Sequence, residues 1–382
     1  MKNLIRVPFF EPYLDAQDKN EIKRALSFKY LTNGPKLEEF ENKFKKFTNA
    51  KFAIGVSNAT SALHLSLKSL DIKKGDEVIV PNLTFVATAN SVLATGATPV
   101  IVDIDEKTLN ISSKSILKNL SKNTKAIIPV HFAGRSCDMK TILKIPKKHS
   151  VKIIEDCAHG IGTFFDKKHV GNFGDVGCFS FYPTKNITTV EGGMIITNNK
   201  KIANFVKLSR NHGISRSLLD RYSSGLPWEY DVENVGYNYR LDEIRSTLGI
   251  SQLKKLRKLN DKRRRLFSRY NRGLSNISNI ITPNEDDLKN NSCHLYVMRI
   301  KKNSKTNRDQ LFKKLSSLGV GCSVHYKPLS ELSIIKKKAI IRDDLSVSKN
   351  ISKEILSLPL YPQLSNYKQD YVIRFIKKIL EN

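Results

Sequence analysis

The sequence has few features of a secreted or membrane protein. Residues 1–26 lack a continuous apolar stretch and become charged almost at once, so we expect no signal peptide. No apolar run approaches the roughly 18 residues that a membrane span needs. The five cysteines are odd in number and form no CxxC pair, which argues against a disulfide framework or a structural zinc site. These absences predict a protein of the reducing cytoplasm without a membrane partner.

Internal repeats and low-complexity tracts are also missing. With 40% hydrophobic and 26% charged residues, the chain has enough apolar surface to offset the entropy lost on folding, so disorder throughout is not expected. At 382 residues it exceeds what one hydrophobic core usually organises. We therefore predict one large and one small domain.

Basic residues outnumber acidic ones, and the formal net charge is +29 at pH 7. Such a charge makes nucleic acid or another polyanion a partner to consider. The basic residues lie along the whole chain, however, and are densest at 254–272 and 336–342. The first segment, with Leu253, Leu256 and Leu259, is typical of an amphipathic helix with a solvated basic face. An anionic small-molecule substrate is the second explanation, and nucleic acid is the least favoured partner.

Short runs rich in β-branched residues alternate with helical stretches from residue 50 onward. The strand-like runs are 51–56, 76–81, 98–105, 124–132, 151–159, 175–182 and 192–198. Strands that are apolar along their whole length and separated by helices indicate a mostly parallel sheet covered on both faces. We therefore predict a large three-layer αβα domain with a mixed, mostly parallel sheet over residues 1–250, including an N-terminal arm. The sparser pattern after it predicts a smaller α/β domain over 251–382.

In open α/β sheets ligands bind beyond the carboxyl ends of the strands, so the residues there are candidate site residues. Residues 57–61 are small and mostly hydroxylated, and they precede a predicted helix whose free amides and dipole would attract a phosphate. An ordinary helix cap is the alternative explanation. Phe85 follows the next strand and could stack on a flat cofactor, although a core aromatic has the same pattern.

Two charged side chains follow later strands. Asp156 directly follows four positions that are expected to be buried, and it needs a cationic or hydrogen-bonding partner because an unpaired buried charge costs about 5 kcal/mol. A capping aspartate is the alternative. Ser180 is another candidate phosphate ligand, and Lys185 follows it between two apolar stretches. Desolvation would disfavour the ammonium form of such a lysine and leave its amine available as a nucleophile.

No one of these residues is specific, but their combination is. A helix N-terminus for a phosphate, an aromatic for a ring, an aspartate for a ring nitrogen and a lysine for an aldehyde are the parts of a pyridoxal 5'-phosphate site. The sequence therefore predicts this cofactor.

The motifs then become recognisable, because the sequence resembles the DegT/DnrJ/EryC1/StrS family of pyridoxal-phosphate-dependent sugar aminotransferases. The resemblance covers essentially the whole chain. It is carried by "TNGPKLEEFE" (32–41), "SNATSALHLSL" (57–67), "GDEVIVPNLTFVATANSVLATGATPVIVDID" (75–105), "IIEDCAHGIGT" (153–163), "GDVGCFSFYPTKN" (174–186), "EGGMIIT" (191–197), "RNHG" (210–213) and "VGYNYRLDEIRSTLGISQLKKL" (235–256). It implies the aspartate aminotransferase fold, which is fold type I of pyridoxal phosphate enzymes.

The resemblance also implies a role for individual residues. Lys185 is implied as the lysine that forms the Schiff base, and Asp156 as the partner of the pyridine nitrogen. The other implied cofactor ligands are Phe85 for stacking, Thr60, Ser61 and Ser180 for the phosphate, His159 near the phenolic oxygen, and Asn238 from the neighbouring subunit of a homodimer. Tyr182 and His325 are implied at the substrate, and a plain structural histidine is the alternative for His325.

Two positions depart from the family pattern. The family commonly has glycine where this chain has Ala59 and again where it has Val190. Alanine lacks the freedom of glycine to take a positive φ, so we expect a slightly rearranged phosphate loop. Val190 is expected to narrow the substrate side of the lysine loop. Neither change removes a catalytic group.

The implied activity is a transamination in two halves. L-Glutamate gives its amino group to the cofactor and leaves as 2-oxoglutarate, and a keto sugar on a nucleoside diphosphate then receives it. The similarity of the segment 226–240 to relatives that aminate C4 favours a 4-keto-6-deoxyhexose. Relatives that dehydrate sugars replace the lysine by histidine, and Lys185 argues against that reaction. Amination of another ring position or of a carbocycle remains open, as does a regulatory or nucleic-acid-binding protein with a vestigial site.

Overall fold

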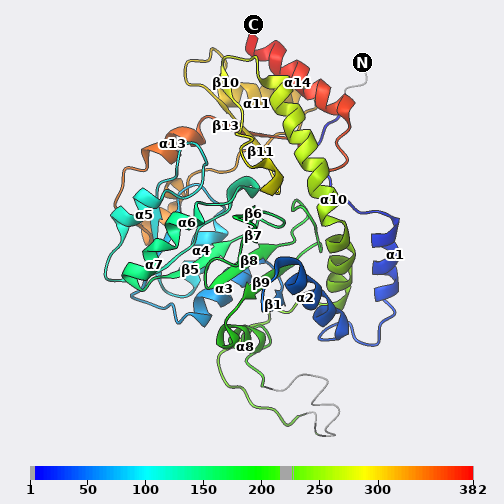
Figure 1. Cartoon of the computed structure of the whole chain (residues 1–382), viewed down its shortest axis with the longest axis vertical. Coiled ribbons are helices and arrows are strands. Elements are labelled where there is room, and N and C mark those ends of the chain that lie inside the picture. The colour runs from blue at the N-terminus through cyan, green and yellow to red at the C-terminus, as the bar shows by residue number, and fades with distance from the viewer. Residues whose placement is uncertain (1–4, 216–225, 227, 382) are drawn as a thin grey trace.

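The computed structural model of the protein describes residues 5–215, 226 and 228–381 (Figure 1). Residues 1–4 of the predicted N-terminal arm and residue 227 of the segment 226–240 lie outside this part. The strands are β1 (Phe52–Val56), β2 (Glu77–Pro81), β3 (Thr98–Val102), β4 (Thr124–Ile127), β5 (Lys152–Asp156), β6 (Phe164–Phe165), β7 (Lys168–His169), β8 (Val176–Ser180), β9 (Gly193–Thr197), β10 (Ile280–Ile281), β11 (Tyr296–Ile300), β12 (Ile340–Ile341) and β13 (Ile355–Leu358).

The α-helices connect these strands and flank them. They are α1 (Ala16–Ala25), α2 (Pro35–Thr48), α3 (Ala59–Ser69), α4 (Ala87–Ala94), α5 (Ser113–Asn119), α6 (Met139–Ile142), α7 (Lys144–His149), α8 (Lys200–Ser209), α10 (Glu243–Leu274), α11 (Arg308–Ser317), α12 (Ser333–Lys338), α13 (Ser346–Ser352) and α14 (Asn366–Glu381). Among the described residues, no helix is both long and apolar enough to cross a lipid bilayer.

In the described part of the chain, eight strands form one sheet in the order β1-β9-β8-β5-β4-β2-β3-β12. Strand β9 runs antiparallel to both β1 and β8, whereas the pairs from β8 to β12 are parallel. The sheet is therefore mixed and mostly parallel, as the sequence predicts. Residues after β1, β2, β5 and β8 consequently meet at one edge of the sheet.

Both faces of this sheet are buried. In β9, Ile195 packs into the core beneath α3, α4 and α8, whereas Met194 and Ile196 pack into the core beneath α2 and α10. Successive side chains of a strand point to opposite faces, so an uninterrupted apolar run indicates a layer on each side. Figure 1 shows β1, β8 and β9 between α3 on one side and α2 and α10 on the other, which agrees with the predicted three-layer arrangement.

The C-terminal part of the chain has a smaller sheet of its own. Strands β10, β11 and β13 pair antiparallel and pack with α11, α14 and the second half of α10. Two observations bear on the division at residue 250, which stays a prediction. Helix α10 crosses that position without a break, and β12 of the C-terminal part pairs with β3 of the large sheet.

The predicted basic helix lies within α10, and its three leucines are buried. Its basic face, however, is not wholly solvated. Arg263 is only 3% exposed and donates hydrogen bonds to the carbonyl oxygens of His294 and Leu360. Burial lowers the pKa of the Arg263 guanidinium to about 10. Part of the positive charge of this segment therefore holds the small sheet against the long helix.

One close approach between backbones shapes the sheet edge that carries the site. A Cβ on Gly193, the first residue of β9, would lie 2.5 Å from the carbonyl carbon and oxygen of Asn58, the N-cap of α3. No real side chain fits at that distance, so glycine lets β9 pass directly under the start of α3.

We predict that Gly193→Ala lowers the free energy of unfolding by about 2 to 3 kcal/mol, because rigid backbone must move. Urea unfolding of the cofactor-free protein measures this loss of free energy of unfolding. The control is Gly75→Ala, where φ is 96° but no atom lies within 4 Å of the added Cβ, and only the backbone cost of about 1 kcal/mol is expected. Equal losses in the two variants would contradict the steric explanation.

Candidate active site

A cavity of about 570 Å³ opens at the carboxyl edge of the large sheet. Eight of the predicted site residues line it, namely Thr60, Phe85, Asp156, His159, Ser180, Tyr182, Lys185 and His325. They come from the start of α3, from the segments after β2, β5 and β8, and from the C-terminal part of the chain. The topology therefore gathers residues that are distant in sequence, as expected for strand ends at one edge.

Asp156 is the last residue of β5 and is 5% exposed. One carboxylate oxygen accepts the amide of Ala158 at 3.1 Å, and the other accepts the hydroxyl of Thr88 at 3.0 Å. Burial raises the pKa of this carboxyl group, and these two donors and the charge of Lys185 only partly oppose it. Its ionised form thus needs a further cation, which a protonated ring nitrogen in the cavity would supply.

Lys185 lies half-buried in the loop that follows β8. Burial lowers the pKa of its amine to about 8, while the charge of Asp156 acts in the opposite direction. An amine with this pKa has a substantial neutral fraction near neutral pH, and only the neutral form attacks an aldehyde. The nucleophilic character that the sequence predicts for Lys185 thus agrees with its environment in the structure.

The neighbours of Lys185 fix its loop to the scaffold. The side chain of Asn186 is buried and donates to the carboxamide oxygen of Asn260 and to the carbonyl of Ser292, both at 2.7 Å. The hydroxyl of Thr188 donates to the carbonyl of Phe181 at 2.9 Å. Polar side chains on both sides therefore satisfy a buried loop that has no strand partner, and they orient the lysine toward the cavity.

The start of α3 forms another wall of the cavity. The Asn58 side chain caps the helix by accepting the amide of Ser61 at 2.8 Å. Among the described residues, the amides of Ala59 and Thr60 have no acceptor, so two donors and the positive end of the helix dipole face the cavity. Ser61 does not line the cavity, and its hydroxyl bonds to that of Ser57 at 2.9 Å. The two free amides and the positive end of the helix dipole fit a phosphate.

His159 is held by backbone and side-chain groups. Its Nδ1 accepts the amide of Ala133 at 3.3 Å, so Nε2 carries the hydrogen and donates to the hydroxyl of Tyr326 at 3.1 Å. Its ring packs against that of His294 with centroids 4.3 Å apart. Burial, and then the charge of Lys185, keeps the pKa of His159 well below its usual value. The imidazole is therefore a neutral hydrogen-bonding group at the cavity.

The remaining predicted residues lie at the mouth of the cavity or outside it. Phe85 and Tyr182 are 57% and 48% exposed, so each presents an uncovered ring beside the cavity. The Nδ1 of His325 bonds to the hydroxyl of Ser357 at 2.8 Å, and burial lowers the pKa of His325 to about 4. Asn238 is exposed and does not line the cavity of its own chain.

The two departures from the family pattern have different outcomes. Ala59 is the first residue of α3 and is not among the residues with positive φ, so alanine is unstrained there. Val190 has a φ of 68°, a region that favours glycine, and its side chain is 56% exposed. It does not line the cavity of its own chain. The substitution therefore costs backbone strain without narrowing this cavity within one chain.

Sequence reasoning missed four residues at or near the cavity: Thr88, Glu191, His294 and Tyr326. Thr88 and Tyr326 hold Asp156 and His159, and Glu191 lines the cavity. His294 bonds to the buried Asn186 behind the lysine. Thr88 lies one helical turn after Thr84, which also lines the cavity, and this spacing was the available signal. His294 and Tyr326 come from the C-terminal part and have no local signal.

Among the described residues, one group of side chains is close enough together to hold a metal ion: His131, Glu155 and Cys157. It is fully buried, and Glu155 is already satisfied by His131 and by the amides of Gly171, Phe173 and Gly174. Burial raises the pKa of the Cys157 thiol well above its usual value, so the thiol keeps its proton. This group therefore supports the sheet edge rather than holding a metal.

The chain is similar to known proteins over nearly its whole length. A sequence profile described as the DegT/DnrJ/EryC1/StrS aminotransferase family matches residues 12–377. The chain is 37% identical over 378 residues to spore coat polysaccharide biosynthesis protein SpsC of Bacillus subtilis, with 98% of this chain and 97% of that protein covered.

Solved structures that are similar to this chain are also aminotransferases. The sugar aminotransferase Spr1654 of Streptococcus pneumoniae in its pyridoxal phosphate form, described as putative, is 28% identical with a TM-score of 0.91, covering 99% of both chains. Helicobacter pylori PseC, an aminotransferase of pseudoaminic acid biosynthesis, is 31% identical with a TM-score of 0.90, covering 99% of this chain and 100% of that one.

The fold and the cavity, with its lysine, buried aspartate and helix N-terminus, define a pyridoxal-phosphate-dependent transaminase of fold type I. Within that class, the protein belongs to the DegT/DnrJ/EryC1/StrS aminotransferase family. Both the predicted family and the predicted cofactor are confirmed.

The lowered pKa of Lys185 predicts the pH dependence of cofactor capture. Below pH 8 the rate of covalent attachment of pyridoxal phosphate to the cofactor-free protein should rise about tenfold per pH unit, and it should level off above pH 8. Stopped-flow absorbance from pH 6 to pH 10 measures this rate. Free Nα-acetyl-lysine amide is the control, since its amine titrates near 10.5. A rate that keeps rising to pH 10 would contradict the effect of burial.

Proposed function

We propose that the protein transfers the amino group of L-glutamate to a keto sugar linked to a nucleoside diphosphate, most specifically a 4-keto-6-deoxyhexose. One observation carries the proposal. Lys185, whose pKa is lowered, shares a cavity with Asp156, a buried carboxylate whose ionised form needs a further cation. The names of the relatives support the sugar, since SpsC serves spore coat polysaccharide biosynthesis and PseC serves pseudoaminic acid biosynthesis.

Asp156 orients and polarises the cofactor in this proposal. When bound, pyridoxal phosphate supplies an electron sink for the carbanion at the Cα of the amino donor. The carboxylate of Asp156 favours the protonated ring nitrogen, which is what makes the ring electron-poor. Thr88 and the amide of Ala158 hold that carboxylate in place from behind.

Lys185 has the second catalytic role. Once the amino donor is bound, its Nζ accepts the proton from the donor Cα, because its pKa of about 8 matches a proton carrier at neutral pH. In the second half-reaction the same amine returns a proton to the sugar carbon that receives nitrogen. The loop anchored by Asn186 keeps the amine at the cavity through both halves.

The other predicted residues complete the assignment. We assign Thr60, Ser61 and Ser180 to the phosphate, Phe85 to one face of the cofactor ring, and His159 to its phenolic oxygen. Tyr182 and His325 are assigned to the sugar. The net charge of +29 favours a substrate with a diphosphate, which carries about two negative charges.

A homodimer with shared sites is also part of the proposal. Asn238 is exposed outside its own cavity, so a role at a cofactor phosphate requires a second subunit. Phe85 and Val190 are more than half exposed near the cavity mouth, and Val235 is 80% exposed. A partner subunit would cover such apolar residues. The proposed location is the cytoplasm, where nucleotide sugars are made and used.

The first test follows the cofactor spectrum. With L-glutamate, the wild-type protein loaded with pyridoxal phosphate should lose the visible band of lysine-bound cofactor and gain the band of pyridoxamine phosphate. Lys185→Ala should show no lysine-bound band at all. Identical spectra for wild type and Lys185→Ala would contradict the lysine assignment and favour a vestigial site, to be followed by a salt-dependent DNA-binding assay.

A panel of keto sugar nucleotides then tests the acceptor. After loading with glutamate, a 4-keto-6-deoxyhexose nucleotide should restore the original band, whereas the free sugar without nucleotide should not. Restoration by a 3-keto sugar or a carbocyclic ketone alone would replace the proposed substrate with one of those alternatives.

The role of Asp156 predicts a selective loss of rate. Asp156→Asn keeps the shape of the side chain but removes its charge, so the protein should still bind cofactor while the glutamate half-reaction slows at least about 100-fold. Single-turnover absorbance measures the rate of this half-reaction. Thr88→Val is the matched control, since it removes one hydrogen bond to the same carboxylate and should cost only about fivefold. A wild-type rate in Asp156→Asn would refute the assignment.

A further inference from the structure

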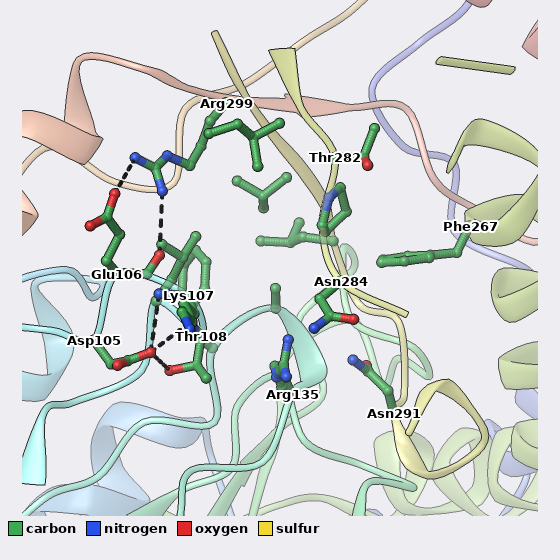
Figure 2. Close-up of a pocket in the computed structure, with 17 residues that line it drawn as sticks. Asp105, Glu106, Lys107, Thr108, Arg135, Phe267, Thr282, Asn284, Asn291 and Arg299 are labelled. Carbon is green, nitrogen blue, oxygen red and sulfur yellow. Dashed lines mark hydrogen bonds and ion pairs between the residues drawn. The ribbon is translucent and has the colours of Figure 1, made fainter. Parts of the chain in front are cut away.

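A second cavity, of about 630 Å³, lies between the large sheet and the small one. It is bounded by residues 105–109 after β3, by the turn 132–135 after β4, by Phe267 of α10, and by residues 281–299 around β10 and β11 (Figure 2). Of the described residues that line it, none lines the cofactor cavity. Its size falls within the range of about 300 to 1,000 Å³ that is typical of small-molecule sites.

The acidic side chains of this cavity already have partners. The carboxylate of Asp105 accepts the backbone amides of Lys107 and Thr108 and the hydroxyl of Thr108, at 2.8 to 3.1 Å. Glu106 pairs with Arg299 at 2.9 Å, as the dashed line in Figure 2 shows. Arg299 pairs in addition with Glu354 at 2.8 Å. Hydrogen bonds therefore satisfy Asp105, and an ion pair satisfies Glu106.

Arg135 differs from them. Its side chain is half-buried and points into the space beside Asn284 and Asn291 in Figure 2. Within the described part of the chain, its guanidinium has no hydrogen-bond or ion-pair partner. Lys107 on the rim is also a cation, and its amine has no described partner. Arg135 thus brings an unpaired positive charge to the cavity, and partial burial makes a free guanidinium receptive to an anion.

Part of the cavity lining is apolar. It consists of Leu109, Phe132, Phe267, Pro283, Leu295 and Val297, most of which are buried residues. The ring of Phe267 extends toward the cavity in Figure 2 and offers a surface for a flat or aliphatic group. Arg135 and the apolar lining residues therefore suit two different parts of one molecule.

We propose that this cavity is a second ligand site, which takes a small organic molecule with one anionic group on an apolar body. Arg135 binds the carboxylate, sulfonate or phosphate through the two parallel donors of its guanidinium. The apolar body lies against Phe267, Leu295 and Val297. The site is independent of the proposed sugar reaction, since its lining residues are separate from those of the cofactor cavity.

The turn 132–135 separates the two cavities. Ala133 has a φ of 56° and lines the second cavity, while its amide donates to His159 of the cofactor cavity. Gly134 has a φ of 94°, and an added Cβ there would lie 2.3 Å from the hydroxyl of Ser292. The turn is thus closely packed, and a molecule in the second cavity contacts the backbone that holds His159.

The test uses 8-anilinonaphthalene-1-sulfonate, an anion on an aromatic body whose fluorescence rises in apolar sites. Protein loaded with pyridoxal phosphate is titrated, so that the cofactor cavity is filled. We expect saturable binding of about one probe per chain, and at least a tenfold weaker affinity in Arg135→Gln. The matched control is Arg257→Gln, which makes the same change at an exposed position of α10 and should leave the affinity unchanged.

A neutral probe tests whether binding depends on the anionic group, and a variant that fills the cavity tests where the probe binds. N-Phenyl-1-naphthylamine has the same rings without the sulfonate, so it should bind wild type more weakly and be insensitive to Arg135→Gln. Ile281→Trp, at a partly exposed position of the wall, should weaken both probes by filling the space. Equal anion affinity in wild type and Arg135→Gln, or no effect of Ile281→Trp, would overturn the proposal. An unchanged cofactor absorbance shows that each variant is folded.

Discussion

A buried carboxylate that shares a cavity with a half-buried amine is the interaction on which the site depends. Asp156 and Lys185 lie in the same cavity, and each charge stabilises the ionised form of the other while burial opposes both. The balance leaves a lysine that readily loses its proton and an aspartate that still needs a cation. Because neither group is fully satisfied by the protein, the site is prepared for a cofactor that supplies the missing charge.

Strand β5 shows how the scaffold achieves this. Glu155 and Asp156 are successive residues, so their side chains point to opposite sides of the strand. Burial alone would raise the pKa of Glu155, but His131 and the amides of Gly174 and Gly171 outweigh it and lower that pKa. The pKa of Asp156 is raised instead. Of two adjacent carboxylates, one therefore anchors the sheet edge and the other remains available for chemistry.

The contact between the large and the small sheets has a comparable division of roles. Arg263 is a cation that the protein satisfies with two carbonyl groups, and it fixes α10 to the C-terminal part. Arg135 is a cation without a partner among the described residues, in a cavity between the same two parts. The high net charge is thus a sum of structural cations, solvated lysines and a few groups that are open to a ligand. Only the structure separates these classes.

The sequence by itself determined the layered fold, the cofactor and the residues at the strand ends. Apolar runs such as 193–197 need a layer on each face, and Lys185, Asp156 and the start of α3 follow strands whose ends meet at one edge. Tertiary structure alone decided which groups support them. Tyr326 bonds to His159 from 167 residues away, and Arg263 is buried although the sequence predicts a solvated basic face for its helix. Local patterns report which face of an element is apolar, whereas contacts between distant elements depend on how those elements pack.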